Sequence, residues 1–294
     1  MDIQALLKAA LSASILMLVF ALGLRASFAD ATSLFRQFLR PPHRLLRALI
    51  AMYVVVPAVA VALGLMLDLP LPVRAAMLAM AIAPIPPILP GKQLKFGGSS
   101  VHVFGLLVAV SLCAVVLVPL VLHVIGQVFH RHVAFSPAQV ARLIGSTVLL
   151  PLLAGLTLRH FAPHWAERLA PWVSRLGTVL LIAGALPVLI AAEPAMAALV
   201  GNGAVLAIAV LVACAIAAGH VLGGPGEDER ATLAFASAMR HPGVALAVAT
   251  VNAPEAPQLG AAVLLYVLLA VVLTTVYGSF ARRNRRRAGH RDGG

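Results

Sequence analysis

The amino-acid sequence predicts an all-α polytopic membrane protein, and three observations carry this prediction. Of the 294 residues, 61% are hydrophobic and only 11% are charged, and the mean hydropathy is +0.99. A soluble domain has roughly a quarter of its residues charged and has too little interior to hide this much apolar surface. Nine apolar runs are each long enough to cross a bilayer as a helix, which takes about 20 residues. Two of the nine are interrupted, one by a cluster of prolines and one by a His-Pro-Gly run, at a depth where an unbroken helix is expected.

The nine predicted transmembrane helices follow one another with short connections, so we expect a single membrane domain over residues 1–294. The first run is also compatible with a signal peptide. We interpret it as a membrane helix, because cleavage would leave the arginines that follow it outside the cell, against the usual charge bias. The predicted spans cover approximately 3–24, 44–66, 71–97, 100–125, 137–159, 167–192, 198–222, 229–253 and 257–280.

The distribution of charge predicts the orientation in the membrane. Lys and Arg concentrate in the loops after the first, third and fifth spans and in the tail at 281–294, whereas the other loops hold few. Short cytoplasmic loops are the ones enriched in these residues. We therefore predict an outside N-terminus, a cytoplasmic C-terminus and a bacterial inner-membrane location. The net charge of +12 then favours contact with anionic membrane lipids, and no nucleic-acid partner is expected.

The third span contains the first interruption, in the run AIAPIPPILPGKQLKF at 81–96. Its four prolines are Pro84, Pro86, Pro87 and Pro90, and Gly91 follows them. Each proline removes a backbone donor, and its ring clashes with the preceding turn of a helix. We predict two half-helices with the break at 84–87.

The eighth span contains the second interruption, His241-Pro242-Gly243, within LAFASAMRHPGVALAVAT at 233–250. The third and eighth spans run in opposite directions, so the two breaks should meet near the middle of the bilayer. Non-helical backbone at this depth is tolerated only inside the protein or along a cavity. Two broken spans in corresponding places are typical of secondary transporters built from inverted repeats. Ordinary proline kinks are the alternative interpretation.

Four polar residues close to the breaks are candidate substrate contacts: Arg240, His241, Lys92 and Gln93. Arg240 lies near the middle of its span, and Asp and Glu occur only at the ends of spans or in loops. A guanidinium in such a place suits a carboxylate, sulfate or phosphate. The alternative is structural, with Arg240 donating to the frayed carbonyls of the third span. The sequence contains no zinc set, nucleophile elbow or phosphate loop, so we expect no metal, no cofactor and no enzymatic activity.

Two stretches of the chain resemble the bile acid:sodium symporter family. They are APIPPILPGKQLKFGGSS with VSLCAVVLVPLVL beyond it, within 83–122, and LAFASAMRHPGVALAVATVNAPE at 233–255. LMLVFALGLRASFAD at 16–30 is similar to the family's second helix, so the first helix is missing here. The resemblance implies two inverted five-helix repeats, with a panel domain that moves against a core of crossed broken helices. The implied panel covers about 3–24, 137–159 and 167–192, and the implied core covers about 44–125 and 198–280.

The sodium site implied by the resemblance is altered in this sequence. The family carries Glu and, four residues later, Gln on the second broken helix, and here these positions are Ala236 and Arg240. Leu89 and Pro90 stand where the first broken helix of the family has Ser-Asn. We therefore predict a transporter of a small organic anion, bile-acid-like or another carboxylate or sulfate, without the family's sodium sites. A sodium-coupled symporter and an efflux carrier of the same fold are alternatives, as is a membrane sensor without flux.

Overall fold

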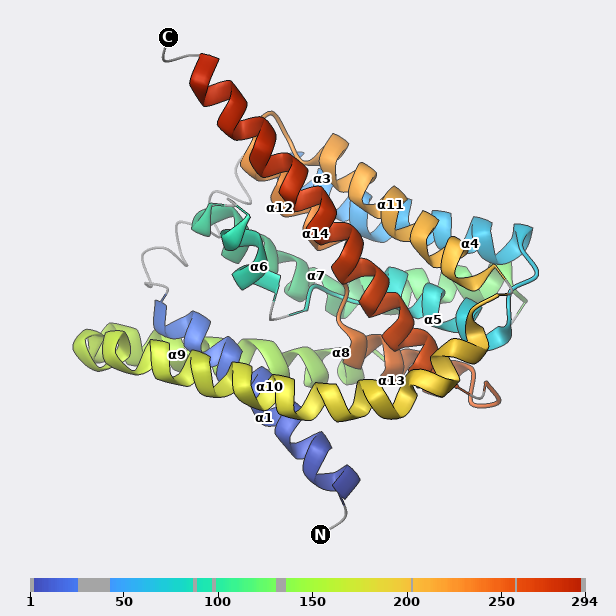
Figure 1. Ribbon diagram of the computed structural model, residues 1–294, viewed down its shortest axis with the longest axis horizontal. Coiled ribbons are helices and arrows are strands. Elements are labelled where there is room, and N and C mark those ends of the chain that lie inside the picture. The colour runs from blue at the N-terminus through green and yellow to red at the C-terminus, as the bar shows by residue number, and fades with distance from the viewer. Residues whose placement is uncertain are drawn as a thin grey trace.

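The computed structural model describes residues 3–25, 43–86, 89–96, 99–130, 136–201, 203–256 and 258–291. Over these ranges the chain forms helices joined by turns and short extended segments, with no strand (Figure 1). The predicted fold class, an all-α polytopic membrane protein, is confirmed.

Six helices in the described ranges are long and apolar enough to cross a membrane. The apolar part of α1 (Ile3–Arg25), Ala9–Arg25, is shorter, and it stands with two interrupted spans at the other three predicted positions. The last helix, α14, ends at Arg291, so residues 281–291 of the predicted basic tail are helical. The six long spans are His43–Met66, His102–Val128, Pro137–Phe161, Pro163–Leu199, Ala204–Leu222 and Leu259–Arg283.

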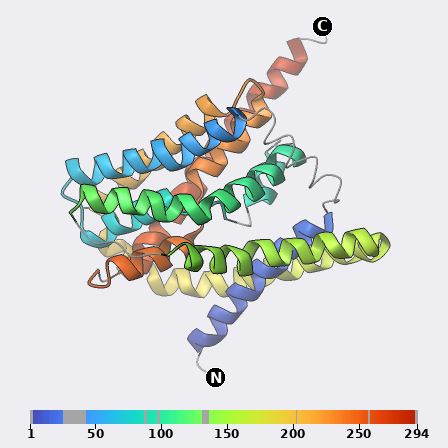
Figure 2. The ribbon, with the colours of Figure 1, turned by 180° about the vertical axis from the view of Figure 1, so that it is seen from behind.

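Three helices, α1, α9 (Leu150–Phe161) and α10 (Pro163–Leu199), pack on one another and form a layer beside the rest of the molecule (Figures 1 and 2). We call them the three-helix group. The approach of α1 to α9 is close, because a Cβ built on Gly155 would lie 2.8 Å from Gly23 Cα. On the α10 side, a Cβ on Gly184 would lie 2.9 Å from Leu11 Cγ. Small residues at such contacts let helix backbones pack closely within a membrane.

The remaining helices share one hydrophobic core, and we call them the core group. A long span, α8 (Pro137–Ile144) followed by the π-helical turn η2 (Gly145–Leu149), leads from this core into α9. The other members are α3 (His43–Ile50), the π-helical turn η1 (Ala51–Val55), α4 (Val56–Met66), α5 (Leu71–Ile82), α6 (Leu89–Lys95), α7 (Ser100–Val128), α11 (Ala204–Leu222), α12 (Glu227–Ala238), α13 (Pro242–Asn252) and α14 (Leu259–Arg291).

The first interruption separates α5 from α6. Pro84 and Pro86 lie in the break and are buried, and Pro87 falls outside the described residues. Pro90 and Gly91, predicted as part of the crossover, instead lie in the first turn of α6. Proline is tolerated there because the first N–H groups of a helix have no partner within it.

The second interruption separates α12 from α13 and covers residues 239–241, slightly earlier than predicted. Pro242 and Gly243 are therefore not in the break but form the first turn of α13. Pro242 fits this position for the same reason as Pro90, since an N–H at the start of a helix would be unpaired in any case. α13 packs on α5, and α12 packs on α6, so each half-helix of one broken span lies against a half-helix of the other.

Candidate functional site

The two breaks touch each other directly. The backbone N–H of His241 donates to the carbonyl of Pro84 at 2.8 Å. This hydrogen bond has a consequence within α12, because the N–H of His241 would otherwise bond to the carbonyl of Ser237, four residues earlier. The Ser237 carbonyl is thus released from the helix at the crossing point.

The guanidinium of Arg240 fills the crossing point and is almost completely buried, with 2% of the residue exposed. Its Nε donates to the Ser237 carbonyl at 2.9 Å. Its Nη1 donates to the carbonyl of Ala83 at 3.1 Å, and its Nη2 donates to the carbonyl of Met52 at 2.7 Å. One side chain therefore joins α12, the first break and η1.

Proline helps to explain why two of these carbonyls, those of Ala83 and Met52, are free. The helical partner of Ala83 would be residue 87, a proline without an N–H. The Met52 carbonyl is freed by the π-helical turn, in which the N–H of Val56 bonds to Ala51, five residues back. The next possible donor to Met52 is Pro57, which has none. Arg240 thus satisfies acceptors that prolines leave without a helical donor.

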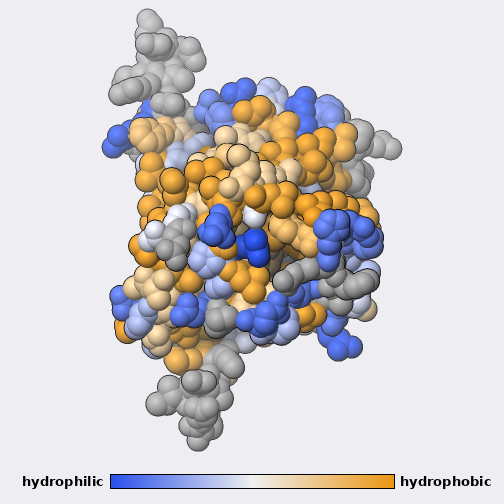
Figure 3. Space-filling model, turned by 90° about the vertical axis from the view of Figure 1, so that its right-hand side faces the viewer, coloured by the Kyte–Doolittle hydropathy of each residue, from blue (hydrophilic) through white to orange (hydrophobic). Residues whose placement is uncertain are grey.

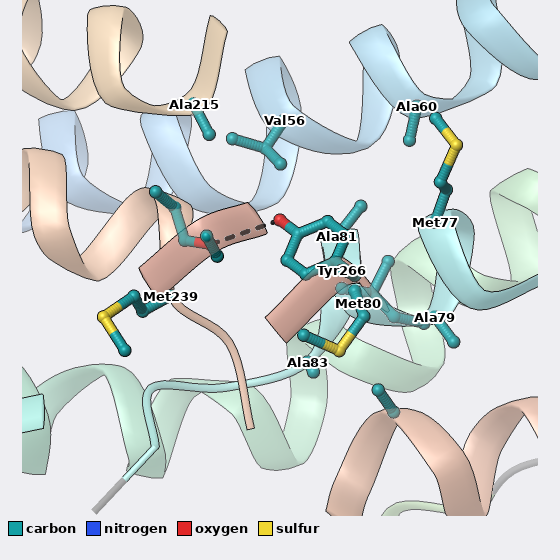
Figure 4. Packing of buried hydrophobic residues seen from close by; sticks show 14 of the residues in the cluster. Val56, Ala60, Met77, Ala79, Met80, Ala81, Ala83, Ala215, Met239 and Tyr266 are labelled. Atoms are coloured by element: carbon teal, nitrogen blue, oxygen red, sulfur yellow. Dashed lines mark hydrogen bonds between the residues drawn. The ribbon is translucent and has the colours of Figure 1, made fainter. Parts of the chain in front are cut away.

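Tyrosines complete the crossing point. The Tyr266 hydroxyl, from α14, donates to the carbonyl of Ala238 at 3.2 Å (Figure 4). The helical donor to Ala238 would be Pro242, which again has no N–H. The Tyr53 ring centre lies 5.9 Å from Arg240 Cζ, within the range of a cation–π contact. The freed carbonyls named here all receive donors from the protein itself, as buried backbone in a bilayer requires.

His241 and Gln93 also lie inside the protein. His241 is 4% exposed, and its Nδ1 accepts from the N–H of Val244 at 3.4 Å, as the N-cap of α13. Gln93 is 2% exposed, and its Nε2 donates to the carbonyl of Thr232 at 2.7 Å, which fastens α6 to α12. In this conformation neither residue lines the two larger cavities, and neither does Arg240.

Lys92, the fourth predicted contact, is half-buried at a cavity. Its Nζ donates to Thr274 Oγ1 at 2.8 Å, to Thr275 Oγ1 at 3.1 Å and to the carbonyl of Val271 at 3.2 Å. The ammonium also lies 5.6 Å from the ring centre of Phe235. These contacts hold Lys92 against α14 and α12 with neutral groups only, so they leave its positive charge uncompensated.

The cavity beside Lys92 has a volume of about 260 Å³ and lies between the three-helix group and α6. We call it the α1–α6–α10 cavity. Arg25 and Lys92 give it two cations, Ser174 and Thr178 give it two hydroxyls, and the described residues that line it include no carboxylate. Its lining is Leu18, Ala21, Leu22, Arg25, Gly91, Lys92, Ser174, Thr178 and Leu181.

Sequence reasoning did not single out Arg25, Ser174 or Thr178. The available signal was the spacing of Ser174 and Thr178, which puts two hydroxyls on one face of a helix. In the sequence, Arg25 is one of several basic residues that follow the first predicted span.

A second cavity, of about 210 Å³, lies at the opposite end of the core group, where α5 begins and α7 and α13 end. Figure 3 looks at this end and shows a hollow with hydrophilic residues, surrounded by hydrophobic ones. Arg74 and Asn252 are the polar residues in a lining that is otherwise small or apolar. Among the residues that the structure describes, no group of three or more His, Cys, Asp or Glu side chains is placed to hold a metal ion.

Comparison with known proteins identifies the family. The family described as "Sodium Bile acid symporter family" matches residues 13–194, which is more than half of the 294 residues. The matched range begins within α1, contains the first broken span, and ends within α10, before Arg240. A search of curated proteins gave no match. With its helical architecture and its two crossed broken spans, the chain belongs to the sodium bile acid symporter family, whose members are membrane transporters.

Proposed function

We propose that this protein is a secondary transporter of a small organic anion that works without a sodium site at the crossing point. In this proposal the three-helix group is the panel, the core group is the core, and movement of one against the other exposes the anion to each side in turn. From the basic residues that follow it, we infer that the end of α1 faces the cytoplasm. The start of α12 has an acidic loop and is assigned to the same side from the number of predicted spans. Family membership supports membrane transport, and the residues described above support the finer assignment.

The observation that carries the proposal is the set of three carbonyl contacts made by Arg240. A sodium ion needs several oxygen ligands, and broken helices supply them as free backbone carbonyls. Here a guanidinium that is part of the chain already occupies three such oxygens. The family resemblance also puts Ala236, which has no ligand atom, where a Glu is expected. Both features favour a fixed cation in place of a mobile one.

The α1–α6–α10 cavity supports the choice of an anion. It lies where the two groups of helices meet, so its shape would change as they move. Arg25 presents planar donors that suit a carboxylate or sulfate, and Lys92 adds a second positive charge. Leu18, Leu22 and Leu181 offer apolar contact to a hydrocarbon skeleton. A hydrophobic organic acid has both an anionic group for the two cations and an apolar skeleton for the leucines.

Uptake into proteoliposomes tests the proposal. Labelled bile acids and smaller carboxylates and sulfates would be offered in sodium and in potassium buffers, with counterflow to separate a carrier from a pore. We expect saturable uptake that is the same in both buffers. Stimulation of uptake by sodium would overturn the sodium-free mechanism and support the symporter alternative.

Substitutions in the cavity test the anion site. Lys92→Gln and Arg25→Gln should each raise KM by about 10- to 100-fold, the equivalent of one lost charge-assisted hydrogen bond. Lys95→Gln is the matched control, because Lys95 lies on the same half-helix, is exposed and does not line the cavity. An unchanged KM in both cavity variants would remove this cavity from the substrate path.

A further inference from the structure

A cluster of four charged or titratable side chains joins the first turns of α3, α7 and α12, away from the crossing point and from both larger cavities. It consists of Arg44, His102, Asp228 and Glu229, and we call it the His102 cluster. Glu229 Oε1 lies 3.1 Å from Arg44 Nη2 and 3.1 Å from His102 Nε2. Asp228 Oδ2 lies 3.5 Å from His102 Nδ1.

The charges of this cluster do not balance when His102 is neutral. Arg44 supplies one positive charge, and Asp228 and Glu229 supply two negative charges. Arg230, which follows them on α12, makes no ion pair with these four groups in the contacts described, and its Nε donates to the carbonyl of Gly224 at 2.8 Å. One proton on His102 would bring the four groups to neutrality.

The contacts of His102 Nε2 show where that proton would go. This atom lies 3.0 Å from Arg44 Nη1 as well as 3.1 Å from Glu229 Oε1. An arginine can only donate and an ionised carboxylate can only accept, so one form of the ring cannot satisfy both. A bare Nε2 accepts from Arg44, whereas a protonated Nε2 donates to Glu229. On the other side of the ring, Nδ1 lies 2.6 Å from Ser99 Oγ.

Glu229 is placed to accept a hydrogen bond from a protonated Nε2. Only 10% of this side chain is exposed. Its Oε2 is buried and has no hydrogen-bond partner among the described residues, and the same holds for Thr232 Oγ1. Both residues line a small cavity of about 30 Å³, together with Arg44 and His102. In the part of the chain that the structure describes, only one oxygen of this buried carboxylate, Oε1, has a donor, so a second positive charge nearby would be stabilising.

The cluster is connected to the crossed helices through Thr232. The carbonyl of Thr232, one turn beyond Glu229 on α12, accepts the hydrogen bond from Gln93 on α6. The start of α12 is thus linked both to the His102 cluster and to α6, a half-helix of the other broken span.

We propose that His102 Nε2 is a proton-binding site whose occupancy sets how α12 is held against α7 and α3. With the proton bound, His102 donates to Glu229 and ties α7 to α12. Without it, His102 accepts from Arg44 and ties α7 to α3. The proposal rests on these ion pairs alone, so it holds whatever the protein transports.

Nitrogen NMR of ¹⁵N-histidine-labelled protein in lipid bilayers tests this site, with the His102 signal assigned by its loss in His102→Gln. We expect Nε2 to change between the bare and the protonated state from pH 8.5 to pH 5. Glu229→Gln should lower the proton occupancy of His102 at any given pH. A single protonation state over the whole range would overturn the proposal, and so would a change that follows sodium concentration instead of pH.

A second measurement separates this proposal from the proposed function. An imposed pH gradient should alter anion uptake by the wild type and by His123→Gln, a control on the same helix, and should have no effect in His102→Gln. If His102→Gln fails to fold, Glu229→Gln and Asp228→Asn provide the assignment, because each should shift only the His102 signal. A failed transport assay with intact NMR behaviour would reject the anion transporter and leave the proton site supported.

Discussion

Replacing Arg240 with Met is the most direct test of how the crossing point is held together. Met keeps an unbranched apolar stem and removes every donor. Three carbonyls, of Met52, Ala83 and Ser237, would then lose their partner. Each buried acceptor without a donor costs about 1–3 kcal/mol, or roughly 3–9 kcal/mol for the three. Removal of a desolvated cation returns several kcal/mol, so we expect a net loss of stability of about 2–5 kcal/mol.

Arg240→Lys separates charge from geometry. The ammonium would stand near the position of the guanidinium carbon, roughly 1.3 Å short of the Nη atoms that reach Met52 and Ala83. It would keep the charge but stretch two hydrogen bonds beyond their useful length. We therefore expect Arg240→Lys also to be destabilised, in contrast to the usual tolerance of an Arg-to-Lys exchange.

Thermal unfolding in detergent, followed by tryptophan fluorescence, provides the comparison. Arg168→Met is the matched control, because Arg168 is exposed on α10, and it should change stability by less than about 0.5 kcal/mol. If Arg240→Met unfolds at the same temperature as this control, the guanidinium does not stabilise the crossing point, and the sodium-free mechanism loses its basis.

Three further predictions use the same unfolding assay. Gly155→Ala should destabilise the protein by about 1–3 kcal/mol, because the new methyl group presses on α1. Gly145→Ala is the control and should be neutral or slightly stabilising, because nothing lies within 4 Å of its new Cβ. Equal effects of the two substitutions would argue against tight packing of α1 on α9. Tyr266→Phe loses only the hydroxyl that donates to the end of α12 and should cost about 1 kcal/mol, and a wild-type midpoint would contradict this hydrogen bond. His241→Leu should cost about 1 kcal/mol while His241→Asn, which keeps a capping acceptor, is tolerated, and identical midpoints would exclude a capping role.

The broken spans were predictable because proline acts locally. A single proline can remain inside a long helix, as Pro119 does in α7, but Pro84 and Pro86 belong to a close cluster of prolines, and such a cluster places the first break to within a few residues. The exact ends were harder to predict, because Pro90 and Pro242 fit equally well into a break and into the first turn of the helix after it. Only the path of the neighbouring backbone decides between these positions.

The role of Arg240 was less predictable, although the sequence raised both possibilities, a substrate contact and a structural donor to broken-helix carbonyls. Its partners come from residues 52, 83 and 237, and the partner in η1 exists only because the hydrogen bonds there shift from four to five residues. No local pattern shows such a shift. Both the α1–α6–α10 cavity and the His102 cluster join residues far apart in the chain, and their members look like ordinary helix-end charges and hydroxyls when they are read one at a time.

A cation that is covalently part of the chain cannot leave with the cargo. Because Arg240 is held by three carbonyls at the crossing point, a monovalent anion carried alone in the proposed mechanism would move one net negative charge across the bilayer. A membrane potential of 100 mV is worth about 2.3 kcal/mol per charge, or about a 40-fold concentration ratio. With a negative cell interior, that electrical force drives the anion outward, and a proton that travels with the anion would cancel it.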